Sequence, residues 1–129
     1  MSEKRFPEKE KMLLEAGLMA AEDTVLDSVA VNYVSPLIGR IGEWKKGWLY
    51  FTEERIVCPF TPPAQGGIVI PYAAITGLKT FSDGVVPGLD VQYTAPDGEP
   101  GIGHFTMLRG RDRWLGFLSG KTGLQPDRE

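Results

Sequence analysis

The sequence predicts an α+β domain that is mainly β, in which a small antiparallel barrel or two-sheet sandwich lies between an N-terminal helix and a C-terminal capping helix. Two observations support this prediction. Residues 47–60 and 68–81 alternate apolar and polar side chains and are broken by turn-forming residues, as half-buried antiparallel strands are. Toward both ends of the chain, apolar residues instead recur every three or four positions, which is the spacing of an amphipathic helix.

Length and composition indicate a single globular core. The chain has 129 residues, of which 42% are hydrophobic and 24% are charged, and these are ordinary values for a folded domain. The net charge of −3 disfavours nucleic acid as a partner, because that binding depends on many phosphate contacts. One cysteine excludes an internal disulfide, and a single histidine adds few ligands for a metal. We therefore expect no metal and no cofactor.

The chain divides into a charged N-terminal segment with a helix at 1–24, a folded domain at 25–120 and a tail at 121–129. Good helix formers continue from residue 8 to about residue 23, with one interruption at Gly17. The first residues lack the apolar stretch of a signal peptide, and no apolar run approaches the roughly 20 residues of a membrane span. We expect a soluble, cytoplasmic protein, with peripheral membrane contact as an open alternative.

The first strand is predicted at residues 25–34, followed by a hairpin. Within the strand, Val25, Val29, Val31 and Tyr33 are expected on one side, and Ser28 and Asn32 on the other. In the hairpin, Leu49 and Phe51 precede the polar turn Thr52-Glu53-Glu54-Arg55, and Ile56 and Cys58 follow it. Because Cys58 is on the apolar side, we interpret it as a small buried hydrophobe rather than a reactive thiol.

The second half of the chain is predicted to contain further antiparallel strands and a closing helix. Pro71 lacks a ladder donor, so its strand lies at an edge or has a bulge. Turns are expected at 83–84, 87–88 and 96–98, with strands at 89–94 and 102–108. The helix is expected at 112–119, with Asp112 as its N-cap and Gly120 as its C-terminal cap.

Several of these runs resemble a GRAM domain, a member of the pleckstrin-homology-like superfold, and most closely its compact bacterial-type members. The motif residues are Gly47, Leu49, Tyr50 and Thr52, then Ile70, Pro71, Ile75 and Thr76, and finally Arg111 and Asp112. The resemblance covers roughly residues 25–119. It implies a barrel or sandwich of pleckstrin-homology type and a non-catalytic binding module for membrane lipids or proteins.

The segment 35–46 is the candidate binding loop. Its apolar residues are Leu37, Ile38, Ile41 and Trp44, and its cations are Arg40, Lys45 and Lys46. The apolar groups could fold over an open end of the barrel or extend a strand, and as a binding role we favour their burial against a protein partner or a second copy of the chain. The alternative is a peripheral membrane module, in which the cations meet anionic lipid headgroups.

A catalytic function is not expected. Cys58 and the single histidine, His104, both fall in predicted strands, and no nucleophile and base pair is evident. The arginines at 109, 111 and 113 are interpreted as a solvated helix start or as members of local ion pairs. A small cone-shaped α+β enzyme is a further alternative, but its pocket would need polar groups facing inward, where these strands supply mostly aliphatic ones.

Overall fold

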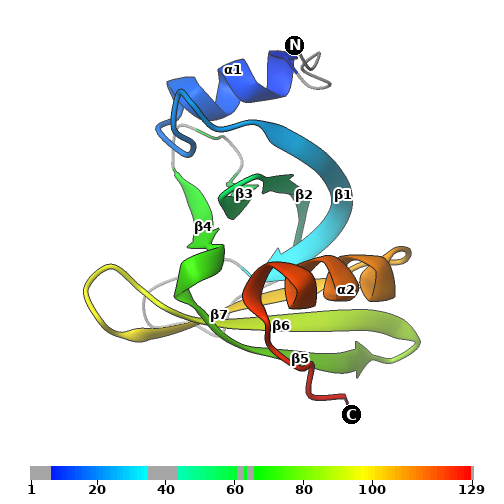
Figure 1. Ribbon diagram of the computed structural model, residues 1–129. Coiled ribbons are helices and arrows are strands. Elements are labelled where there is room, and N and C mark those ends of the chain that lie inside the picture. Colours follow the sequence, from blue (N-terminus) through cyan, green and yellow to red (C-terminus); the bar gives the residue numbers. More distant parts are fainter. Residues whose placement is uncertain (1–6, 35–43, 61–62, 64–65, 129) are drawn as a thin grey trace.

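The computed structural model of the chain describes residues 7–34, 44–60, 63 and 66–128. In chain order its elements are α1 (Pro7–Glu15), β1 (Val25–Val34), β2 (Trp44–Thr52), β3 (Arg55–Pro59), β4 (Gly67–Pro71), the 3₁₀ turn η2 (Tyr72–Ala74), β5 (Ile75–Asp83), β6 (Val86–Thr94), β7 (Pro100–Thr106) and α2 (Arg111–Thr122). Within these residues, seven strands form one antiparallel sheet in the order β4-β3-β2-β1-β7-β6-β5 (Figure 1). A mainly β domain with a helix at each end is confirmed.

The sheet is open rather than closed, so the barrel form of the prediction is wrong. β4 and β5 are the two edge strands, and η2 carries the chain from one to the other. In the register of the described residues, β1 meets β7 only at Asn32 with Thr106 and Tyr33 with Phe105. This narrow seam joins two halves, β1–β4 and β5–β7, as in the two-sheet form of the prediction.

α2 fills the space between the two halves and closes the main core (Figure 1). Trp114, Leu115 and Leu118 are buried there with residues from both halves of the sheet. The ring of Trp114 stacks on Phe51 of β2, with ring centroids 3.9 Å apart and an interplanar angle of 6°. Because stacked aromatic rings add to the stabilisation from burial alone, this contact fixes the helix on the sheet. The predicted C-terminal capping helix is confirmed.

α1 covers the other face of the β1–β4 half (Figure 1). Leu13 packs in a second cluster with Val25, Tyr50 and Val57. Tyr50 lies between two core residues of β2, so strand alternation places it on the face opposite the main core. Oε2 of the buried Glu10 accepts the backbone N–H of Val25 at 2.8 Å, which joins α1 to the start of β1. α1 therefore covers the part of this face around Tyr50 and Val57.

α1 is shorter than the helix predicted at 8–23. Gly17 has φ of 72°, and the N–H groups of Gly17 and Leu18 bond to the carbonyls of Leu14 and Leu13. This pattern is a Schellman cap, in which a glycine in the left-handed region ends a helix. The interruption that the sequence showed at Gly17 is therefore the helix terminus.

The first hairpin is confirmed, and its apolar residues face the main core. These residues are Leu49, Phe51, Ile56 and Cys58. The predicted side of Val25 is wrong, because a register shift between Val25 and Asp27 turns its side chain toward α1 rather than toward the side of Val29. The prediction for Pro71 is confirmed, since β4 is an edge strand and ends at that residue.

Three predicted boundaries in the second half are wrong. Residues 87–88 lie inside β6, because the preceding turn already reverses the chain at Gly84, where φ is 62°. Asp112 is in the first turn of α2 rather than at its N-cap, which is Gly110. The helix continues past Gly120 to Thr122 and ends at Gly123, where φ is 73°. Helix-terminating glycines cannot be distinguished from interior ones by residue type alone.

Candidate binding surface

Residues 44–46 are the beginning of β2 rather than part of a loop, and this changes which of their side chains share a face. Strand alternation places Trp44, Lys46 and Trp48 on the outer face of the sheet, whereas Lys45 is opposite Tyr33 on the other face. Trp48 remains 51% exposed and Trp44 39% exposed. The alternation of the side chains at 44, 46 and 48 is present in the sequence. It was not applied to residues 44–46 because the strand was expected to begin at Gly47.

The four other residues of the predicted binding loop lie outside the described residues. They are Leu37, Ile38, Arg40 and Ile41. Their part in binding stays a prediction. Trp44, Lys45 and Lys46 are described, and the structure brings Trp44 and Lys46, but not Lys45, onto one surface with residues of β1 and β7.

A groove of about 730 Å³ lies on this side of the sheet, between β1 and the connection that follows β7. Its lining comes from β1, β2, the end of β7 and the connection to α2: Val29, Ala30, Val31, Asn32, Lys46, Gly47, Trp48, Thr106, Met107, Leu108 and Arg109. Trp48 and Leu108 are its most exposed large apolar side chains, and Leu108 is 80% exposed. An apolar groove that presents a tryptophan to solvent is unusual on a surface with no binding role.

Two cations accompany the apolar groups in this groove. Lys46 enters from β2 and Arg109 from the connection to α2. Among the described residues, neither side chain has a carboxylate within ion-pair distance. The other two arginines of the 109–113 cluster are engaged: Arg111 bonds the carbonyl of Phe81, and Arg113 pairs with Asp27 at 2.8 Å. Local ion pairs are confirmed for Arg113 with Asp27 and for Arg111 with Asp112, at 3.6 Å, and Arg109 is exposed, as the alternative of a solvated helix start expects.

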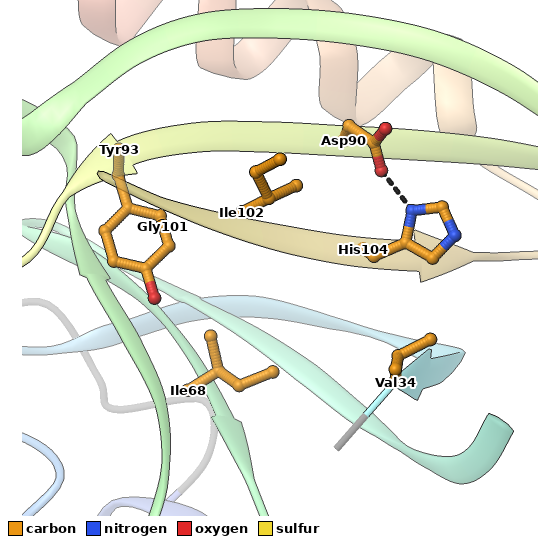
Figure 2. Close-up of a pocket in the computed structure, with 7 residues that line it drawn as sticks. All are labelled: Val34, Ile68, Asp90, Tyr93, Gly101, Ile102 and His104. Carbon is orange, nitrogen blue, oxygen red and sulfur yellow. Dashed lines mark hydrogen bonds and ion pairs between the residues drawn. The ribbon is translucent and has the colours of Figure 1, made fainter. Parts of the chain in front are cut away.

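A second cavity of about 430 Å³ lies where the ends of β1 and β4 approach β6 and β7. Val34, Ile68, Asp90, Tyr93, Gly101, Ile102 and His104 line it (Figure 2). Nδ1 of His104 faces Oδ1 of Asp90 on the neighbouring strand. Neither Asp90 nor Tyr93 was singled out in the sequence, because their approach depends on the β6–β7 register.

His104 is held between two aromatic rings on the outer face. Its ring stacks on Trp44, with centroids 4.9 Å apart, and on Phe81, with centroids 4.3 Å apart. Gly88 makes this arrangement possible, because a Cβ at that position would be 2.2 Å from the Phe81 ring. Trp44 therefore has a structural contact in its own chain in addition to its exposed surface.

The residues considered for catalysis do not meet. Cys58 is buried in the main core, whereas His104 lies on the outer face of β7. Burial raises the pKa of the Cys58 thiol to about 12, so it is protonated at neutral pH and is a weak nucleophile. The interpretation of Cys58 as a small buried hydrophobe is confirmed. Among the described residues, no three histidine, cysteine, aspartate or glutamate side chains are grouped to hold a metal ion.

Comparison with solved structures supports the fold. The chain is similar to "The hSac2 domain from human phosphoinositide phosphatase Sac2", with a TM-score of 0.59, 9% identity, and coverage of 99% of this chain and 92% of that chain. It is also similar to a structure described as "Vps36 N-terminal PH domain", with a TM-score of 0.49, 15% identity, and coverage of 82% and 81%. No family model matches the sequence, and no curated protein matches it.

The fold is pleckstrin-homology-like, and the cone-shaped alternative does not describe it. The strand order and the helix that follows the last strand carry this assignment, and likeness at this level of identity concerns the fold alone. No helix among the described residues is long and apolar enough to cross a membrane.

Proposed function

We propose that the chain is a non-catalytic binding module of the GRAM type that binds a protein partner, with a second copy of itself as the first candidate. The observation that carries this proposal is the groove between β1 and the connection to α2, with Trp48 and Leu108 exposed to solvent. Side chains at the centre of protein interfaces are enriched in tryptophan and arginine, and this groove presents both. The module corresponds to residues 25–120.

The hSac2 domain is named as part of a phosphatase, and its fold likeness carries no activity to this chain. The motif residues of the GRAM resemblance also fit a structural role, because Leu49 and Ile70 are fully buried and Thr52 organises the hairpin turn. The binding function must therefore come from the surface side chains.

Size-exclusion chromatography with light scattering tests the proposal. We expect the native chain to form an oligomer, and Trp48→Ser with Leu108→Ser to convert it to a folded monomer. Val85→Ser is the matched control, because Val85 is 98% exposed and lines neither the groove nor the cavity. Trp44 is left intact, since its removal would also disturb the stack on His104. A native monomer would contradict self-association, and an oligomer unchanged by both groove substitutions would contradict the groove as its interface.

Binding to anionic lipid is the second candidate, and the cations of the groove favour it. Lys46 and Arg109 could meet headgroup phosphates while Trp48 enters the interface. Sedimentation with phosphatidylserine vesicles should then fall with rising salt, because ionic screening shortens to about 10 Å near 0.1 M. Lys46→Gln should weaken sedimentation, whereas Lys45→Gln removes the same charge from the opposite face. Equal effects of the two substitutions would count against this surface.

A further inference from the structure

The second cavity is separate from the groove and has a different chemistry. The two share no lining residue. Most of its wall is apolar, formed by Val34, Ile68, Ile102 and the ring of Tyr93. The polar side chains Asp90 and His104 lie together at one end of the cavity, on neighbouring strands (Figure 2). An apolar wall with a few convergent polar groups is the usual composition of a small-molecule site.

The polar end of the cavity presents a carboxylate oxygen without a partner among the described residues. Oδ1 of Asp90 accepts the hydrogen bond from Nδ1 of His104. The second oxygen of Asp90 has no hydrogen-bond or ion-pair partner among the described residues. This oxygen would attract a ligand that donates a hydrogen bond, and the negative charge of Asp90 favours a cation.

The pair is held in place before any ligand arrives. Trp44 and Phe81 stack on the two sides of the His104 ring, so the imidazole is fixed in the plane that meets Asp90. Preorganised polar groups bind more tightly, because less side-chain freedom is lost on association. Because Trp44 is the first residue of β2, the position of this end of the strand also affects the orientation of the His104 ring in the cavity.

The opposite end of the cavity is shaped by Gly101 and Tyr93. A Cβ at Gly101 would be 2.6 Å from Cζ of Tyr93, so only glycine allows the Tyr93 ring to lie across β7. Figure 2 shows this ring projecting from β6 toward Ile68. The ring and the aliphatic side chains leave an apolar region for the body of a ligand.

We propose that this cavity binds a small organic amine, with its ammonium group on Asp90 and its apolar body against Ile102, Ile68 and Tyr93. Lys79 is opposite Asp90 on β5, but among the described residues it forms no ion pair with that carboxylate. This inference does not depend on the proposed function of the groove.

Titration of the ¹⁵N-labelled chain with hexylamine, 1-hexanol and hexanoate, followed by NMR, tests the proposal. The three probes share one apolar chain and differ in the charge and hydrogen-bonding of the head. We expect hexylamine to shift the amide signals of residues 90, 93 and 101–104, and to bind at least tenfold more tightly than 1-hexanol. A hydrogen bond to a charged group accounts for a difference of this size.

Two substitutions separate the head from the body of the ligand. Asp90→Asn should remove the tenfold preference for the amine, whereas Asp83→Asn, at the exposed end of β5, should leave it unchanged. Ile102→Ser should weaken hexylamine and 1-hexanol by a similar factor. The ¹⁵N spectrum of each variant reports whether the fold is intact. No shifts at these residues, equal binding of amine and alcohol, or an unchanged preference in Asp90→Asn would overturn the proposal.

Discussion

Replacing Asp23 by alanine should lower the free energy of unfolding by about 3 kcal/mol. Its buried carboxylate accepts the Thr52 hydroxyl at 2.6 Å and the N–H groups of Thr24 and Glu53 at 2.8 and 3.1 Å. Hydrogen bonds to charged groups contribute about 1.5–3 kcal/mol each. Two of these donors have a second acceptor, because the Glu53 N–H also bonds the Thr24 carbonyl and the Thr52 hydroxyl can turn to the Arg55 carbonyl. The loss is therefore less than the sum of three bonds.

Urea denaturation followed by tryptophan fluorescence measures this change. Asp112→Ala is the matched control, because Asp112 is 70% exposed and its ion pairs are on the surface, where such pairs contribute about 0–1 kcal/mol. The double variant with Thr52→Val should show a coupling of about 1–2 kcal/mol, since the two side chains are in direct contact. A loss below about 1 kcal/mol for Asp23→Ala, or additive effects with Thr52→Val, would refute this account of the turn.

Three further changes test the core and the helix ends. Trp114→Ala should lower the free energy of unfolding by about 3–5 kcal/mol in urea denaturation, because it removes the stack on Phe51. Gly17→Ala should lower it by about 1–2 kcal/mol in the same assay, because the position requires a left-handed backbone. As pH rises from about 9 to 12, stability should fall, because the unfolded state releases the Cys58 proton first and the folded state retains it. The fall measured by urea denaturation should be less steep in Cys58→Ala.

Much of the fold followed from local patterns. The hairpin around Thr52 was predictable because apolar alternation on both strands and a polar turn indicate the same structure. The helix ends were less predictable, because Gly17, Gly120 and Gly123 are one residue type and only the backbone conformation distinguishes them. Closure into a barrel could not be decided from the sequence, since it depends on whether the β4 and β5 edges meet.

The candidate surface was predictable only in part. Trp44 and Lys46 were recognised because apolar and cationic residues together are conspicuous in a short segment. Leu108 and Arg109 line the same groove as Lys46, although roughly half the chain separates them in the sequence. The β1–β7 seam brings them together. The pairing of Asp90 with His104 also depends on register, because shifting one strand by one residue would send the two side chains to opposite faces.

The outer surface and the core are coupled through one glycine. Gly47 lies between Lys46 and Trp48 of the groove, and a Cβ there would be 2.7 Å from the Tyr33 ring on the inner side. Tyr33 is fully buried, so it cannot move away without disturbing the core. A larger residue at position 47 would therefore push β2 away from β1 and shift both neighbouring side chains of the groove. The binding surface is set by inward packing as well as by the residues that it exposes.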